Sequence, residues 1–325
     1  MASEFDLIER FFRPLGEGPG VTLGIGDDTA ILDMSPGCQL LATVDTLVAG
    51  VHFPDTATPA DIGYKSLVVN LSDIAAMGGT PRWATLALTL PAPDDAWLSA
   101  FAEGLAGACR RFGVSLVGGD TTRGPLTITI QLLGEVSRGM AVRRDGAHPG
   151  DALYVTGTLG DAGLGLACEQ GRLQVSEAAS DFCRERLHRP QPRLAVGQAL
   201  QGVATAAIDI SDGLLADLGH ILEKSGLGAE VRLDALPLSA SLSDAMAAGC
   251  ADWHLPLAAG DDYELLFAVP PGREAGIARI ADETGCAITR IGHLTGEAGT
   301  RVLDAAGRPW AYTRNGYDHF RSEDR

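Results

Sequence analysis

The spacing of apolar residues changes several times along the first half of the chain, and each change predicts a new element. An apolar run at 40–44 predicts a short strand that ends at Asp45. Helical spacing follows from Thr58 to about Met77, with threonine as N-cap and proline at the first helical position. The same reasoning predicts a strand, a helix and two further strands, at 84–90, 95–112, 114–117 and 126–136.

The second half begins after a polar, basic and turn-rich segment. This segment, 138–150, predicts a linker between an N-terminal domain at 1–137 and a C-terminal domain at 151–325. Beyond it, apolar runs predict strands at 152–155, 204–210, 264–269 and 287–291. Strands that alternate with helices indicate an α/β (α+β) fold, and 325 residues favour two domains over a single core.

Two common nucleotide-binding motifs do not fit the chain. The glycines at 157, 160 and 163 lack the G-x-G-x-x-G spacing, so they predict a tight turn from a strand into a helix. The only lysines are Lys65 and Lys224, and neither lies in a G-x-x-x-x-G-K-[ST] loop. This pattern excludes a P-loop and the strand lysine of protein kinases.

Composition narrows the possible partners and the compartment. A formal net charge of -17 argues against binding to a nucleic-acid backbone. The chain has no apolar run near the roughly 20 residues that a membrane span needs, and its N-terminus does not resemble a signal peptide. Six cysteines without a C-x-x-C pair indicate reduced thiols, so we expect a cytoplasmic protein with no membrane partner.

Five short segments share an aspartate at the end of a predicted strand or on a helix beside one. They are Gly26–Thr29, Thr43–Thr46, Asn70–Asp73, Gly118–Thr121 and Asp209–Gly213. Each alone is more typical of a turn or a cap, but five of the same design favour a common role. Donors that are all oxygen suit Mg²⁺ better than zinc, and neighbouring glycines let backbone amides approach phosphate. The segments therefore predict a polyphosphate site that holds several Mg²⁺ ions.

Four other side chains have a structural and a functional interpretation. His52 is equally compatible with a packed loop and with a substrate contact. Arg143 and Arg144 belong either to a basic linker or to a phosphate site, and Ser211 is either an N-cap or a phosphate contact. No nucleophile lies beside a base in a known motif, so the sequence disfavours covalent catalysis.

Taken together, the motifs resemble the thiamine-monophosphate kinase family of the aminoimidazole-ribonucleotide-synthetase-like ATP-binding superfamily. The resemblance runs from end to end of the chain and includes D-T-L-V-A-G-V-H-F at 45–53, which separates this family from its relatives. The other matching segments are 5–8, 24–28, 70–78, 118–122, 209–214, 261–265 and 316–320.

The resemblance implies that ATP phosphorylates thiamine monophosphate and that several Mg²⁺ ions hold the phosphates. It implies no acid, base or nucleophile from the protein. It leaves open whether a monovalent cation assists. The implied metal ligands are Asp28, Thr43, Val44 (through its backbone), Asp45, Asp73, Asp120, Asp209 and Asp212. The implied ATP contacts are Gly119, Asp120, Arg144 and Ser211. The implied thiamine contacts are His52, Asp261 and one tail aromatic, Tyr317 or Phe320.

The resemblance also implies an N-terminal mixed sheet with helices that forms a homodimer, and a C-terminal α/β sandwich. A nucleotide-contacting tyrosine of some family members has no counterpart in 101–112. Two alternatives stay open from the residues. One is a superfamily enzyme that uses ATP on a different phosphorylated or acidic molecule. The other is a non-catalytic metal-binding protein, although the chain has no EF-hand loop.

Overall fold

The computed structural model describes residues 4–312 and 316–317 and separates into two compact units. Unit 1 contains the chain up to Ile74 together with Gly79–Ala141. Unit 2 contains Ala75–Gly78 and the chain from Val142 onward. Each unit has its own sheet and its own buried core.

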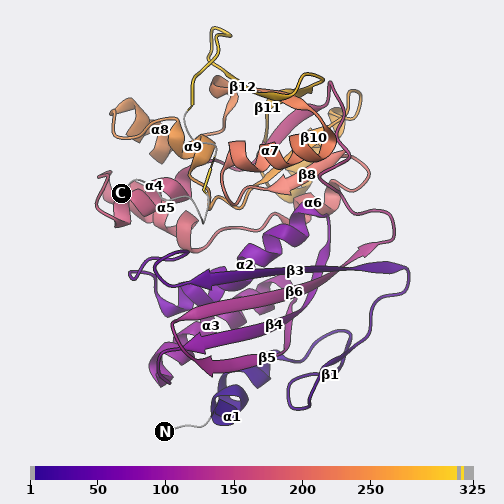
Figure 1. Cartoon of the computed structure of the whole chain (residues 1–325), viewed down its shortest axis with the longest axis vertical. Coiled ribbons are helices and arrows are strands. Elements are labelled where there is room, and N and C mark those ends of the chain that lie inside the picture. The colour runs from indigo at the N-terminus through magenta and orange to yellow at the C-terminus, as the bar shows by residue number, and fades with distance from the viewer. Residues whose placement is uncertain (1–3, 313–315, 318–325) are drawn as a thin grey trace. The chain divides into compact units, whose positions relative to one another are not determined.

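Unit 1 is a mixed four-stranded sheet with two long helices packed against one face (Figure 1). The strand order is β3-β6-β4-β5; β4 and β5 are parallel, and the other pairs are antiparallel. The elements are α1 (Glu4–Leu7), a π-helical turn η1 (Ile8–Phe12), a 3-10 turn η2 (Arg13–Leu15), β1 (Val21–Leu23), β2 (Ile31–Leu32), β3 (Cys38–Val48), α2 (Pro59–Ala76), β4 (Thr80–Leu90), α3 (Asp95–Phe112), β5 (Ser115–Arg123) and β6 (Thr127–Ser137).

The two long helices form where their local sequence signals predict them. The hydroxyl of Thr58 accepts a hydrogen bond from the backbone N–H of Asp61 and donates one to its carboxylate, which caps the start of α2. In α3 the cap is Asp94, which accepts from two backbone N–H groups of the first turn. Leu71 of α2 and Phe101 of α3 are fully buried and contribute to the core of this unit.

Two strands of unit 1 are longer than the sequence predicts. β3 continues through Asp45 to Val48, and β5 continues through 118–120 to Arg123. Polar residues and glycines interrupt the apolar pattern at these places, but hydrogen bonding to a neighbouring strand continues. β3 pairs with β6 along its whole length, from Cys38 opposite Ser137 to Val48 opposite Thr127. The expectation that the first strand ends at Asp45 is therefore wrong.

Unit 2 is built, within the described residues, on a sheet of six strands in the order β12-β9-β11-β7-β10-β8. Only β12 and β9 are parallel among these pairs. The elements are β7 (Ala152–Thr156), α4 (Asp161–Glu169), α5 (Glu177–His188), α6 (Leu194–Ala199), β8 (Ala206–Asp209), α7 (Leu214–Ser225), β9 (Gly228–Arg232), a 3-10 turn η3 (Leu233–Ala235), α8 (Ala240–Ala247), α9 (His254–Ala258), β10 (Leu265–Val269), α10 (Ala275–Thr284), β11 (Ile288–Thr295) and β12 (Gly299–Leu303).

Alternation along the central strands of unit 2 buries both faces of the sheet. On β10, Leu266 and Ala268 belong to a core shared with α7, whereas Leu265 and Phe267 belong to a core shared with α6 and α10. Every residue of β7, β8 and β10 is buried, as expected for strands covered by helices on both sides. The sequence-based prediction of an α/β fold with two domains, a mixed N-terminal sheet and a C-terminal α/β sandwich is confirmed.

The glycine-rich stretch after β7 is the predicted strand-to-helix turn. β7 ends at Thr156, and α4 begins at Asp161. Within the ranges that the structure describes, no helix is both long enough and apolar enough to cross a membrane.

Candidate phosphate and metal site

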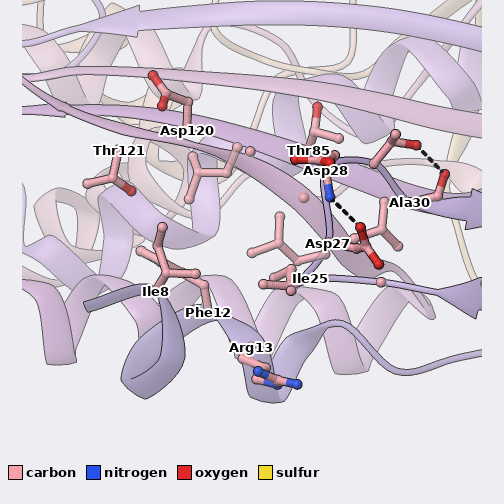
Figure 2. A pocket seen from close by; sticks show the side chains of 18 of the residues that line it. Ile8, Phe12, Arg13, Ile25, Asp27, Asp28, Ala30, Thr85, Asp120 and Thr121 are labelled. Atoms are coloured by element: carbon pink, nitrogen blue, oxygen red, sulfur yellow. Dashed lines mark hydrogen bonds between the residues drawn. The ribbon is translucent and has the colours of Figure 1, made fainter. Parts of the chain in front are cut away.

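One pocket in unit 1 brings together two of the aspartate segments (Figure 2). It has a volume of about 770 Å³, and residues 24–30 form one wall while 118–121 of β5 form another. Asp28 and Asp120 both line it, and Ile8 and Phe12 of η1 supply apolar surface. Asp28 is exposed, and its backbone N–H donates to the carboxylate of Asp27 at 2.9 Å. The pocket therefore combines an apolar wall with carboxylates and glycine backbone.

Gly119 fits this pocket only because it lacks a side chain. Its φ is 153°, and a Cβ atom there would lie 1.9 Å from the carbonyl oxygen of Leu86 on β4. Contact with the neighbouring strand thus gives a structural reason for glycine at this position. The same absence leaves the backbone of β5 accessible where it lines the pocket.

A second group of predicted ligands lies on the helix-covered face of the sheet. The hydroxyl of Thr43 on β3 donates to a carboxylate oxygen of Asp73 on α2 at 2.5 Å. Asp45 is two residues further along β3, so its side chain leaves the same face. The side chain of Val44 leaves the opposite face and is 59% exposed, which agrees with a predicted contact through its backbone only.

The strand register separates these two groups within unit 1. Asp45 lies opposite buried Ile130, whereas Asp120 lies beside exposed Ala87. Because side chains alternate between the faces of a strand, the carboxylates of Asp45 and Asp120 leave opposite faces of the sheet. The structure thus brings Asp28 together with Asp120 in one pocket, and Thr43 together with Asp73 with Asp45 on the same face, but it does not merge the two groups.

The donors on the helix-covered face fit a hard cation. They are all oxygens, and the side-chain oxygen of Asn70, one turn before Asp73, is buried and has no hydrogen-bond partner among the described residues. An orphaned buried oxygen costs free energy unless a water or an ion satisfies it. In the part of the chain that the structure describes, no three His, Cys, Asp or Glu side chains converge on one point.

His52 lies in the turn that follows β3 and is half-buried. Its Nδ1 accepts a hydrogen bond from the backbone N–H of Val48 at 3.0 Å. An Nδ1 that accepts cannot carry the proton of a neutral ring, so the proton is on Nε2. The bond fixes the ring to the turn and assigns Nε2 as a donor.

In unit 2 the segment after β8 carries three predicted ligands. Asp209 is the last residue of β8 and is buried, while Ser211 and Asp212 are half-buried in the turn before α7. Gly213 ends that turn with a φ of 117°, and a Cβ atom there would lie 2.8 Å from Ala258. The turn is therefore packed closely against the end of α9.

Asp217 of α7 binds the backbone of the same turn, although sequence reasoning did not single it out. One carboxylate oxygen accepts three backbone hydrogen bonds, from the N–H groups of Ser211, Asp212 and Gly213 at 3.0, 3.1 and 3.2 Å. Burial, and then the charge of Asp212, raises the pKa of Asp217 to about 7, and the three donors act in the opposite direction. The available signal was a carboxylate among leucines of an otherwise apolar helix face.

The predicted thiamine contacts of unit 2 adjoin this turn. Asp261 has a φ of 64°, unusual for a residue other than glycine, and its N–H donates to the carbonyl of Ser211 at 2.8 Å. The N–H of Tyr317 donates to the carbonyl of Asp212 at 3.0 Å, and the tyrosine side chain is exposed. Phe320, the other tail aromatic, lies outside the described residues.

The two basic residues of the predicted linker, Arg143 and Arg144, differ in the structure. Both side chains are exposed, but Arg143 forms a two-pronged ion pair with Asp145, at 2.9 and 2.5 Å. Arg143 is thus engaged locally, and of the two arginines Arg144 is the better candidate for a phosphate contact.

A buried ionic network supports the loop that carries Asp261. Glu264 is fully buried; Arg193 donates to both of its oxygens at 2.5 and 2.6 Å, and Arg186 donates to one of them at 2.6 Å. Burial alone would raise the pKa of Glu264, but the hydrogen bond and charge of Arg193 and the charge of Arg186 lower it. Sequence reasoning missed this role because Arg186 and Arg193 lie 78 and 71 residues before Glu264.

Two family models match consecutive parts of the chain. The N-terminal domain of AIR synthase related proteins matches residues 26–136, and their C-terminal domain matches 148–305. A thiamine-monophosphate kinase of Salmonella typhimurium is 46% identical over 319 residues, 98% of each chain.

Solved structures agree with this assignment. A thiamine-monophosphate kinase of Stenotrophomonas maltophilia superimposes with a TM-score of 0.83 at 44% identity, covering 88% of this chain and 92% of its own. The structure of AaThiL complexed with AMPPCP and TMP gives 0.78 at 34% identity, covering 98% and 97%. The chain belongs to the thiamine-monophosphate kinase family, within the AIR synthase related proteins.

Proposed function

We propose that this chain transfers the γ-phosphoryl group of ATP to the phosphate of thiamine monophosphate, giving ADP and thiamine diphosphate. The observation that carries the proposal is the full-length similarity to a relative complexed with AMPPCP, an ATP analogue, and TMP. Full coverage matters because the residues proposed for the two substrates are spread from Asp28 to Tyr317.

We assign the nucleotide phosphates to the pocket of unit 1. Asp28 and Asp120 line this pocket together with the backbone of Gly119. The apolar wall of the pocket suits contact with a base or ribose. Ser211 and Arg144 of unit 2 are the other proposed phosphate contacts. A phosphate beside carboxylates needs an intervening positive charge, so nucleotide binding here should depend on a divalent cation.

The acceptor in this reaction is itself an anion, so repulsion and positioning dominate the barrier. Mg²⁺, when bound, would supply positive charge that offsets this repulsion. The protein's part is to fix the cations through Thr43, Asp45 and Asp73 of unit 1 and through Asp209 and Asp212 of unit 2. Because the acceptor phosphate is already ionised, no general base has to remove a proton.

We assign the thiamine moiety to His52, Asp261 and a tail aromatic. The Nε2 of His52 is a hydrogen-bond donor, because Nδ1 is occupied by the backbone of Val48. Asp261 supplies a carboxylate on a loop that the buried Glu264 network holds in place, which suits a cationic thiazolium ring. Tyr317 is 40% exposed, and we assign its ring to stacking on thiamine.

The proposal is tested by measuring ADP release from ATP with Mg²⁺ and each of several acceptors. We expect release only when thiamine monophosphate is present and none after chelation of the metal. A superfamily enzyme with another substrate would release no ADP with thiamine monophosphate. A non-catalytic metal-binding protein would be stabilised by Mg²⁺ without releasing ADP with any acceptor.

A further inference from the structure

The turn between β8 and α7 is held from one side by a single carboxylate. Asp217 is only 3% exposed, and one of its oxygens accepts the N–H groups of three consecutive residues, Ser211–Gly213. Its neighbours on α7, Leu214, Leu215 and Leu218, are buried apolar residues. A buried acid among leucines is costly unless its oxygens are hydrogen-bonded, so the three donors explain how it is tolerated.

The carbonyl groups of the same turn are bound from other segments. The carbonyl of Ser211 accepts from the N–H of Asp261, and the carbonyl of Asp212 accepts from the N–H of Tyr317. The turn therefore directs its N–H groups to Asp217 and two of its carbonyls to segments proposed to contact thiamine. Moving the turn would move the attachment points of both segments.

We propose that Asp217 is a positioning residue that fixes the Ser211–Gly213 turn, and through it both the metal-binding carboxylate of Asp212 and the attachment of Asp261. This inference rests on the proposed function, which assigns Asp212 to a metal and Asp261 to thiamine. Asp217 itself contacts neither substrate. It acts as the outer partner that orients a ligand, a role known to tune metal affinity.

One consequence concerns how phosphate is bound beside α7. The N–H groups of Ser211, Asp212 and Gly213 are already used by Asp217, so they are not donors for an anion. A phosphate at this turn is therefore bound through the Ser211 hydroxyl and through cations at Asp212, not through the amides of the turn.

The test uses the full chain and three variants. Asp217→Ala removes the acceptor, while Asp217→Asn keeps an acceptor oxygen of the same shape but removes the charge. Asp151→Asn is the matched control, because Asp151 is also buried and its carboxylate accepts from the backbone N–H of His148 at 3.0 Å. Asp151 lies away from the Ser211–Gly213 turn. Its neighbour Ala152 pairs with Val269 at one end of β10, whereas Asp209 of β8 pairs with Leu265 at the other end.

Two quantities are measured for each protein: Mn²⁺ affinity, by electron paramagnetic resonance with a non-hydrolysable ATP analogue, and the midpoint of thermal unfolding without metal. We expect Asp217→Ala to weaken Mn²⁺ binding about 10- to 100-fold, the range for residues that orient metal ligands. The Mn²⁺ affinity of Asp217→Asn should lie between those of Asp217→Ala and the wild type. Asp151→Asn should lower the unfolding midpoint while its Mn²⁺ affinity stays within about twofold of the wild type.

The inference is overturned if Asp217→Ala loses thermal stability but binds Mn²⁺ as Asp151→Asn does. If Asp217→Ala does not fold, the inference is tested by comparing the Mn²⁺ affinities of Asp217→Asn and Asp151→Asn in the same way. The Mn²⁺ titration needs no turnover. A wild-type protein that makes no thiamine diphosphate, with an Asp217 variant that still loses Mn²⁺ affinity, would therefore overturn the proposed function and support this inference.

Discussion

The hydroxyl of Thr43 on β3 donates a hydrogen bond to the carboxylate of Asp73 on α2, across 2.5 Å. The bond ties a strand to the helix that covers it, and Asp45 leaves the same face of the strand two residues later. Two carboxylates and a hydroxyl thus share one side of the unit 1 sheet. Like charges on one face destabilise the protein unless a cation lies between them.

Replacing either carboxylate by its amide tests whether the group holds metal. We expect Asp45→Asn and Asp73→Asn each to lower turnover at least about 100-fold, equivalent to about 2.7 kcal/mol of transition-state stabilisation. The metal-free unfolding midpoint should stay unchanged or rise, because crowding of negative charge is relieved. Asp95→Asn is the control, because this exposed residue of α3 pairs with Arg10. Full activity of Asp45→Asn, or an Asp73→Asn protein that does not fold, would make these residues structural.

The open face of the unit 1 sheet predicts a homodimer. Leu40 and Val44 of β3 are 48% and 59% exposed on the face that the helices do not cover. We expect a particle of about 68 kDa by light scattering, twice the 33.8 kDa of one chain, because a symmetric dimer is the commonest oligomer. Leu40→Glu should give a monomer, whereas Met34→Glu, in the loop before β3, should not. A wild-type monomer at micromolar concentration would contradict the prediction.

Glu264 should make the stability of unit 2 depend on acid pH. Its pKa is lowered in the folded state, so its contribution is present above the unfolded value of about 4.3 and is lost as pH falls below it. At pH 7, Glu264→Gln removes the charge that pairs with the half-buried Arg186 and Arg193 and should lower the free energy of unfolding by about 3–5 kcal/mol.

Denaturant unfolding between pH 3 and pH 7 measures this contribution. The difference between wild type and Glu264→Gln should shrink below about pH 4.3. Exposed Glu283, which pairs weakly with Arg279 on α10, gives the control variant Glu283→Gln, with little change at any pH. A constant difference across the range would show that the ionised pair does not stabilise the fold.

Direct transfer predicts that the protein is never phosphorylated. Burial raises the pKa of Cys109 and of Cys183 to about 12, so these thiols stay protonated and are poor nucleophiles. With γ-labelled ATP and Mg²⁺ but no acceptor, we expect no label on protein after either acid or alkaline quenching. Labelled protein that then transfers its phosphate to thiamine monophosphate would require a covalent step.

Local signals predicted the helices better than they predicted the strands. α3 has its expected bounds because Asp94 caps its start and Gly113 ends it, and both signals lie in the adjoining sequence. The lengths of β3 and β5 depend on pairing with strands far along the chain, which polar residues at 45 and 118–120 conceal. The amphipathic elements β9, β12, α5 and α10 were not predicted at all.

The candidate site, too, could be predicted only in part from the sequence. The segments proposed to hold ligands stood out in the sequence because aspartate beside glycine or serine is an unusual residue choice next to an apolar strand. The supports were not, because Asp217 gains its role from three N–H groups of a folded turn and Glu264 from distant arginines. The sequence shows which residues carry charge, but only folding shows which of them hold others in position.

In the proposed reaction the acceptor of the phosphoryl group is a phosphate and not a hydroxyl. The most direct measurement incubates the protein with ATP and Mg²⁺, and with either thiamine or thiamine monophosphate, and identifies the products by mass spectrometry. We expect thiamine diphosphate from thiamine monophosphate and no phosphorylated product from thiamine, because no base is proposed to deprotonate a hydroxyl. Robust phosphorylation of thiamine itself, or formation of ADP from ATP in the presence of thiamine monophosphate without any thiamine diphosphate, would contradict it.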